Sequence, residues 1–153
     1  MPLIKKFCLM WLFIIVGITI AYYYFNRQLN TIRLPINSEI TDIKIPPILH
    51  LSQTGPQNQW QVNQQAANAT KITALVTALR QPCRAAYSID SLEKNDDKQP
   101  LTVYINDDLY VIGDHQDISQ TNYIYHQNSV YLCHEIIKYY FSQPLEYWLL
   151  KGE

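Results

Sequence analysis

The sequence predicts an α+β fold: one N-terminal transmembrane helix, then a small domain of antiparallel sheet with two helices on one face. Three observations support this prediction. Residues 7–25 contain no charged side chain and no proline. Further along, apolar and polar residues alternate in several short segments, which is typical of half-buried strands. Apolar residues at helical spacing occur once near the middle of the chain and again near its end.

The run 7–25, FCLMWLFIIVGITIAYYYF, has the length of a membrane span. Its 19 residues would extend about 28 Å as a helix, close to the roughly 30 Å hydrocarbon core of a bilayer. Lys5 and Lys6 precede the run, and aromatic residues close it as in an interfacial belt. A cleaved signal peptide is the alternative, although Thr19-Ile20-Ala21 makes a poor cleavage site. We therefore expect a cytoplasmic tail at 1–6 and a transmembrane anchor at 7–25.

The tail indicates on which side of the membrane the domain lies. Lysine and arginine flank the run almost equally on its two sides, so the charge balance does not fix the orientation. A very short tail before a first apolar run is typical of a signal anchor. We therefore expect a single-pass protein of the cell inner membrane with a periplasmic domain. Residues 26–42 show no strong period and are predicted to form a stalk, which leaves 43–153 for the folded domain.

The domain is predicted to begin with strands. Pro46-Pro47 interrupts a group of isoleucines and restricts any strand there to an edge or an end. Residues 49–52 and 60–62 alternate apolar and polar side chains on either side of Thr54-Gly55-Pro56-Gln57-Asn58. Such alternation around a turn that contains Gly and Pro favours a hairpin.

One segment then has a clear helical period. Its apolar residues are Ala69, Ile72, Leu75, Val76 and Leu79. This spacing predicts an amphipathic helix of 12 to 16 residues. Asn63 or Asn68 is the predicted cap at its start, and Pro82 is expected to end it.

The rest of the domain is predicted to consist mainly of strands. We expect strands at 85–89, 101–105, 109–112, 123–125 and 130–133. Asn106-Asp107-Asp108 and His126-Gln127-Asn128-Ser129 are the predicted turns. The last segment, 135–148, is predicted as a helix broken at Pro144, because proline is tolerated only in the first turn of a helix.

The order of these elements resembles a known family. The positions that carry the resemblance are Trp60-x-Val62, the amphipathic helix, Leu101-x-Val103-x-Ile105, Tyr110-Val111-Ile112-Gly113, Tyr123-x-Tyr125, Val130-Tyr131-Leu132 and Pro144-Leu145. They are similar to the uncharacterised single-pass periplasmic domains found beside gliding-motility-type ABC transporter components. The resemblance covers roughly 105 residues of this chain. It implies a small envelope domain accessory to a transporter, and it brings no catalytic residues with it.

The cysteines indicate a covalent link. Cys8 lies within the predicted anchor, so Cys83 and Cys133 are the only pair in the domain. An even pair in a translocated domain favours a disulfide. Closing a loop of about 50 residues would stabilise the domain by up to roughly 4 kcal/mol. The alternative is two buried free thiols.

Residues capable of catalysis or metal binding do not follow recognised spacings. The chain has four histidines, His50, His115, His126 and His134. None of the intervals between them is typical of metal ligands. Asp114-His115-Gln116-Asp117 comes nearest to a metal cluster but, like Asp107-Asp108, is predicted to be a turn. Cys133 and His134 are neighbours on a strand and point to opposite faces, which disfavours a thiol nucleophile. We expect no enzyme and no cofactor.

Aromatic residues are the remaining candidates for a binding surface. Five tyrosines lie on predicted strands: Tyr104, Tyr110, Tyr123, Tyr125 and Tyr131. Exposed tyrosines can bind a protein partner or stack on sugar rings. Packing against cross-strand neighbours is the more common role of tyrosine in a sheet, and it stays open here as the alternative.

Charge excludes one class of function. All 13 acidic residues follow the apolar run, against 10 lysines and arginines, a balance of −3. Nucleic-acid binders need a surplus of positive charge. The sequence therefore predicts a membrane-anchored, non-enzymatic component of a cell-envelope complex with a protein partner. The alternative is a binding module for cell-wall glycan or a small ligand.

Overall fold

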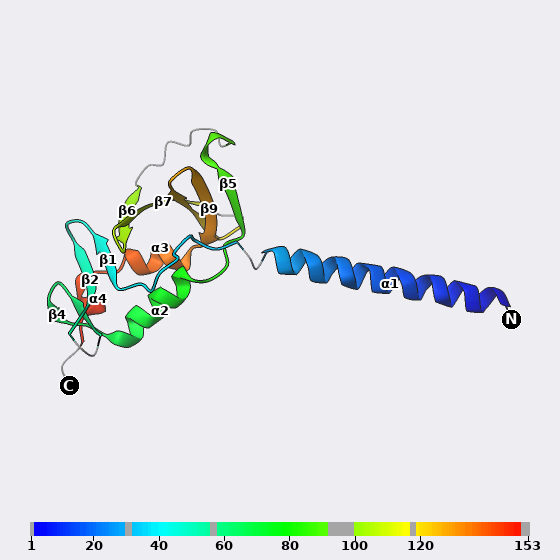
Figure 1. Cartoon of the computed structure of the whole chain (residues 1–153), viewed down its shortest axis with the longest axis horizontal. Coiled ribbons are helices and arrows are strands. Elements are labelled where there is room, and N and C mark those ends of the chain that lie inside the picture. The colour runs from blue at the N-terminus through cyan, green and yellow to red at the C-terminus, as the bar shows by residue number, and fades with distance from the viewer. Residues whose placement is uncertain (1, 30–31, 56–57, 92–99, 117–118, 151–153) are drawn as a thin grey trace.

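Figure 1 shows the protein as a computed structural model, which describes residues 2–29, 32–55, 58–91, 100–116 and 119–150. A long N-terminal helix, α1 (Pro2–Leu29), extends away from a domain in which a curved sheet surrounds short helices. The side chains of α1 are described from Met10 to Phe25 and at Arg27.

Helix α1 corrects the first prediction. It has 28 residues, and every described side chain from Met10 to Phe25 is exposed. Among the described residues, no helix combines the length and the apolar character that crossing a membrane requires. The predicted transmembrane helix at 7–25 is thus contradicted; the side chains of 1–9, Cys8 included, lie outside the described part.

All the described strands belong to one sheet in the order β4-β3-β2-β1-β6-β7-β8-β9-β5. Every neighbouring pair in it is antiparallel. The strands are β1 (Asp42–Ile45), β2 (Leu49–Thr54), β3 (Gln59–Val62), β4 (Gln65–Ala66), β5 (Ala85–Ser88), β6 (Leu101–Ile105), β7 (Asp108–Gln116), β8 (Thr121–His126) and β9 (Ser129–His134).

The predicted fold class is therefore wrong in its proportions as well as in its anchor. The nine-stranded sheet dominates the domain, and the helices packed on it are small. Pairing along the sheet recruits residues that lack an apolar alternation of their own, such as Gln65 and Ala66 in β4. It also extends β7 through Asp114 and His115, where a turn was predicted, with a change of register between Ile112 and His115.

The tight turns agree with their residue types. β2 and β3 pair as the predicted hairpin, with Leu51 opposite Val62. Pro46-Pro47, joined by a cis peptide bond, follows the end of β1, so this interior strand contains no proline. Asn106 and Asp107 both have positive φ between β6 and β7. That conformation is typical of a type I′ hairpin turn, and asparagine and aspartate tolerate it better than most residues.

The predicted stalk, 26–42, differs from expectation because its second half packs on the domain. Leu34 and Ile40 are buried in the core. The Asn106 side chain holds this segment: its Oδ1 accepts from the backbone N–H groups of Thr41 at 3.0 Å and Asp42 at 3.1 Å. Its Nδ2 donates to the Glu39 carbonyl at 2.6 Å. The approach to β1 is therefore fixed by the turn after β6.

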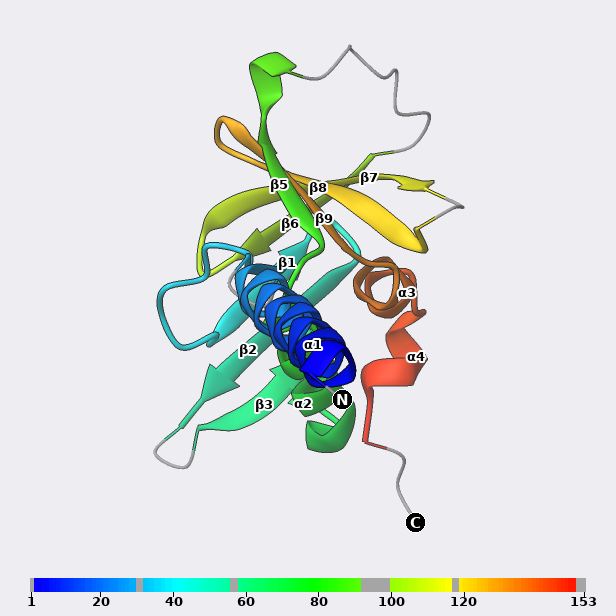
Figure 2. The ribbon, with the colours of Figure 1, turned by 90° about the vertical axis from the view of Figure 1, so that its right-hand side faces the viewer.

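Three α-helices lie together on the inner side of the curved sheet, as Figure 2 shows. They are α2 (Ala69–Leu79), α3 (Ile136–Phe141) and α4 (Leu145–Trp148); a 3-10 turn, η1 (Ile89–Ser91), follows β5. α2 is the predicted amphipathic helix, and Asn68 caps it by accepting from the Lys71 N–H at 3.2 Å. The last helix is broken before Pro144, as predicted.

Candidate interaction surface

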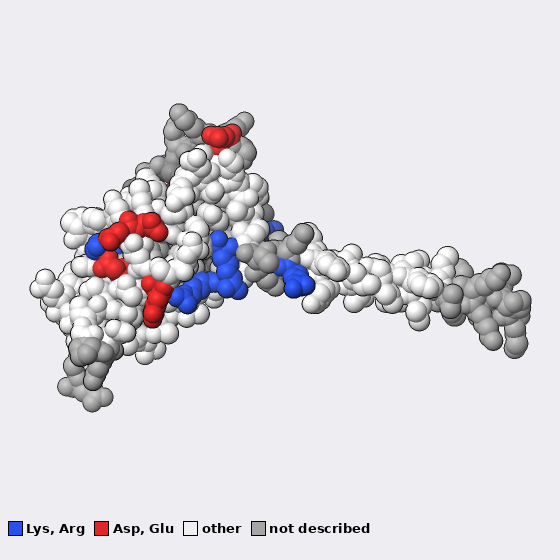
Figure 3. All heavy atoms as spheres, in the orientation of Figure 1, with Lys and Arg blue, Asp and Glu red and all other residues white. Residues whose placement is uncertain are grey.

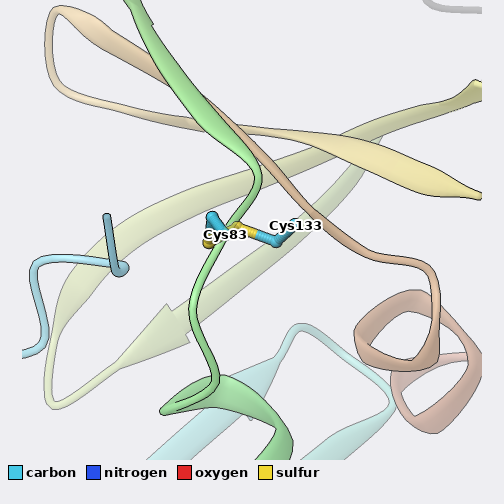
Figure 4. The surroundings of a disulfide bond; sticks show 2 residues. All are labelled: Cys83 and Cys133. Atoms are coloured by element: carbon cyan, nitrogen blue, oxygen red, sulfur yellow. A yellow bond between two sulfur atoms is a disulfide. The ribbon is translucent and has the colours of Figure 1, made fainter. Parts of the chain in front are cut away.

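A disulfide fastens one end of the sheet. Cys83, just before β5, is bonded to Cys133 in β9, with an S–S distance of 2.03 Å (Figure 4). Both residues are buried. The predicted disulfide is confirmed, and it places the Cys133 sulfur in a covalent bond, where it has no thiolate to act as a nucleophile.

Two of the five candidate tyrosines lie on the inner face of the sheet. Tyr110 is 2% exposed and stacks on the buried His126 ring, with centroids 4.3 Å apart. Burial, with a smaller contribution from the nearby Asp108, raises the pKa of Tyr110 to about 12. Tyr131 is half-buried and packs against the core. The structure thus assigns these two tyrosines to packing.

The other three candidates, Tyr104, Tyr123 and Tyr125, are half-buried on the opposite face. They alternate along their strands with buried core residues, and side chains two apart in a strand share a face. The rings of Tyr123 and Tyr125 have centroids 6.5 Å apart. These tyrosines therefore form part of a partly accessible aromatic surface.

That surface has a continuous line of residues running from strand to strand. Opposed residues of neighbouring strands point to the same face, so the pairing defines one row. The row, called here the outer row, consists of Thr102, Val111, Tyr125, Val130 and Tyr87, from β6, β7, β8, β9 and β5 in turn. Tyr87 is 44% exposed. The outer row ends at Tyr87, on the last strand of the sheet.

The two ends of the sheet differ in how they are covered. At β4, the Leu150 N–H donates to the Ala66 carbonyl at 3.0 Å, and Ala67 forms a bridge with Leu149. The C-terminal segment therefore covers that end. At β5, Ala86, Tyr87 and Ser88 are all exposed, and β9 is the only described strand that pairs with it. β5 is therefore the last of the described strands in the sheet.

The sequence had not singled out Tyr87. The predicted strand at 85–89 contained it, and the charged residues on either side of that strand could have indicated an edge strand. Arg84 precedes the strand and Asp90 follows it, and charged residues beside a short strand are a common feature of edge strands.

The histidines are dispersed over the domain. His50 Nε2 lies 2.6 Å from Asp42 Oδ1, and His115 Nε2 lies 3.5 Å from Glu135 Oε2. His126 Nδ1 lies 2.9 Å from the Leu109 carbonyl oxygen. In the segment 114–117, which was predicted to be a turn, residues 114–116 belong to β7 and Asp117 lies outside the described residues. In the described part of the chain, no three His, Cys, Asp or Glu side chains are grouped so that they could hold a metal ion.

On the outer face, the carboxylate of Asp42 interacts with two neighbouring basic side chains. Asp42 accepts from Lys44 Nζ at 2.9 Å as well as facing His50. Partial burial raises the pKa of Asp42, but the hydrogen bonds from Lys44 and His50 outweigh it, so the pKa lies below its ordinary value. Asp42 is therefore a carboxylate at neutral pH. Figure 3 shows acidic and basic side chains intermixed on this part of the surface.

A hollow of about 530 Å³ lies between α3 and the ends of β7 and β8. Its lining includes His115, Asn122, His134, Glu135 and Lys138. The carboxamide atoms of Asn122 are buried and have no hydrogen-bond partner among the described residues. Lys138 Nζ donates to the Gly113 carbonyl at 2.8 Å. The hollow has polar groups of both signs, and no spacing in the sequence indicated it.

Comparison with known proteins adds no relative: no family model, no curated protein and no solved structure matches this chain.

Proposed function

We propose that this protein is a non-enzymatic component of a cell-envelope complex, whose sheet domain presents an interaction surface to a protein partner outside the cytoplasm. The observation that carries the proposal is the outer row. Its five residues lie on five strands without a charged side chain, and all of them except the buried Val130 are at least partly exposed. Half-exposed aromatic residues on a rigid element are enriched at protein interfaces.

Two features support a location at the envelope. Disulfides persist in oxidising compartments, and the buried Cys83–Cys133 bond fits the periplasm better than the cytoplasm. The exposed apolar side chains of α1 are suited to contact with lipid, and we propose the inner membrane as the site of attachment. Cell fractionation at neutral pH tests this: the protein should sediment with the membranes. Full release into the supernatant would contradict the attachment.

Capture of the partner tests the interaction surface. The tagged full chain, cross-linked in its own membrane, should recover the same protein in repeated experiments. Replacing Tyr123 and Tyr125 together by serine should reduce this recovery, because both rings lie on the proposed surface. Tyr139→Ser is the matched control, since Tyr139 is 54% exposed but lies on α3. Equal loss with both variants would argue against the outer face. Components of transporters are the first proteins to look for, given the resemblance to domains found beside them.

The alternative function is binding of cell-wall glycan or a small ligand. The neighbouring rings of Tyr123 and Tyr125 favour it, because sugar rings stack on half-exposed tyrosines. Sedimentation with purified peptidoglycan separates the two proposals. Pelleting that the Tyr123/Tyr125 variant loses would favour the glycan; no pelleting would remove this alternative and leave the protein partner.

A further inference from the structure

Arginine is confined to one region of the protein, the junction between α1 and the domain. The chain has four arginines, Arg27, Arg33, Arg80 and Arg84, and each of them is exposed. Arg27 lies in the last turn of α1. Figure 3 shows basic side chains gathered where α1 meets the domain, while most of the acidic side chains lie farther from α1.

Contacts between distant segments bring the other three arginines together. The Cys83 N–H donates to the Ile32 carbonyl at 2.7 Å, so Arg33 and Arg84 each follow directly after one of two bonded residues. Arg33 and Arg80 line one hollow of about 520 Å³, called here the arginine hollow. The segment that follows α1 and the end of α2 thus contribute one guanidinium group each to the same site.

The charge of the arginine hollow is not balanced within the described part of the chain. Among the described residues, none forms an ion pair or a hydrogen bond with the guanidinium groups of Arg33 and Arg80. Glu39 is the one acidic residue in the described lining, so the site keeps a net positive charge. A guanidinium group can bind a phosphate through two parallel hydrogen bonds. The arginine hollow is therefore suited to a phosphate group.

The position of the arginine hollow indicates where that phosphate comes from. Exposed aromatic residues, Tyr22 to Phe25, close the described apolar part of α1, and Arg27 follows them. Tyrosine is enriched at the level where the apolar interior of a membrane meets the headgroups. Since α1 is proposed to contact lipid, Arg27 lies at that level, and the hollow begins four residues after the end of α1 at Leu29. Phospholipid phosphates are the anions found there.

We propose that the arginine hollow binds the phosphate of anionic phospholipid headgroups and, with Arg27 and Arg84 beside it, holds the domain against the membrane surface. An anionic membrane surface attracts basic residues that lie close to a membrane-attached helix, and the attraction falls off within about one Debye length. This inference rests on the attachment of α1 in the proposed function, to which it adds a second contact with the same membrane.

Fluorescence quenching beside the two arginines tests the proposal. Asn37→Cys, in a Cys8→Ser background, carries a fluorescent label in the lining of the hollow, while Cys83–Cys133 remains a disulfide. The full chain is bound to phosphatidylcholine vesicles that contain a lipid with a nitroxide quencher on its headgroup. Adding phosphatidylglycerol to the vesicles should increase the quenching of this label. Gln65→Cys is the matched control: Gln65 is exposed on β4, away from α1 in Figure 1, and the quenching of its label should not change.

Removing charge identifies the residues responsible. Arg33→Gln combined with Arg80→Gln should abolish the increase in quenching at the Asn37→Cys label. Lys44→Gln combined with Lys71→Gln removes the same charge from other parts of the domain and should keep the increase. Both arginines are exposed, so their variant should fold, which an unchanged urea unfolding curve checks. Salt at about 1 M, where the Debye length is about 3 Å, should weaken the increase.

Two results would overturn the proposal: no response of the Asn37→Cys label to phosphatidylglycerol, or an equal response when both arginines are replaced by glutamine. Sedimentation of the protein with phosphatidylcholine vesicles would then show that attachment through α1 stands without headgroup binding. Failure to sediment with either kind of vesicle would contradict the attachment as well. Cross-linking of Asn37→Cys to an acidic protein, without a response to phosphatidylglycerol, would assign the arginines to that protein instead of to lipid.

Discussion

The two ends of the sheet are stabilised by different means. At the β4 end, the C-terminal segment lies along a strand of only two residues and bonds to it through the backbone. Trp148, directly before that segment, is fully buried. At the β5 end, a disulfide joins Cys83 to Cys133, and no described strand covers the far side of β5. One end is closed by packing and hydrogen bonds, whereas the other is fastened by a disulfide.

This difference bears on function. An exposed edge strand that frays would lose entropy on every encounter with a partner. The disulfide fixes the start of β5 against β9 without covering its outer edge. A covalent link can therefore hold an edge in place and still leave it open to a partner, which a covering segment cannot do. The disulfide at the β5 end is thus compatible with the interaction role proposed above, whereas the covering segment at the β4 end stabilises the sheet.

The largest expected loss of stability comes from a substitution at the β4 end of the sheet. Trp148→Ala should lower the free energy of unfolding by about 3–5 kcal/mol, because it removes a large buried side chain and leaves a cavity. Trp148 packs edge-to-face on Tyr147, with ring centroids 5.0 Å apart. Urea denaturation measures the change. Trp148→Phe is the control and should cost clearly less, since it keeps a ring in the site and removes an indole N–H that has no partner among the described residues.

Removing the disulfide at the β5 end should lower the free energy of unfolding by somewhat less. Replacing Cys83 and Cys133 together by alanine should destabilise the domain by about 2–4 kcal/mol, because the link restricts the unfolded chain. Alanine is tolerated at these buried sites because it adds no polar group. Cys8→Ala is the control and should leave the unfolding curve unchanged. If the double variant is as stable as the native chain, the disulfide does not stabilise this end of the sheet.

A smaller effect is expected from one lysine at the β4 end. Lys71 Nζ donates to the Tyr147 carbonyl at 2.8 Å and lies 4.1 Å from the centroid of the Tyr147 ring. Lys71→Met keeps the apolar stem but loses both contacts, which should cost about 1 kcal/mol. Hydrogen exchange should become faster at the Leu150 amide, which bonds to Ala66. Lys138→Met, which removes a bond to Gly113 in β7, should leave the Leu150 amide protected.

The sequence predicted best the features that depend on neighbouring residues. The hairpin at 49–62 and the helix over 69–79 follow from local periods and from the residues that cap and turn the chain. The disulfide followed from the number of cysteines. The two-residue strand β4 could not be predicted, because its pairing with β3 and the covering C-terminal segment create it.

The candidate surface was only partly predictable for a related reason. Leu109, Tyr110, Val111 and Ile112 are all apolar or aromatic, so the pattern does not indicate which of them face the core. Register with β6 and β8 decides it, placing Tyr110 inside and Val111 outside. Leu34 and Ile40 likewise lack a period, and the stalk prediction overlooked their burial. The features that the sequence did not predict depend on contacts between segments that are far apart in the chain.

The pH dependence of Tyr110 tests the middle of the sheet, between the two ends. The pKa of this buried phenol is raised to about 12, above its ordinary value of 10.0. A raised pKa means that the contribution of Tyr110 is fully present below about pH 10 and is lost as the pH rises toward 12, because the unfolded chain ionises first. At pH 11 the loss should be roughly 1 kcal/mol. Tyr110→Phe cannot ionise and should remove this part of the alkaline destabilisation. Unfolding measured at pH 8 and pH 11 checks it, with Tyr139→Phe as an exposed control. If Tyr110→Phe loses as much stability between the two pH values as the native chain does, alkaline pH acts at groups other than Tyr110.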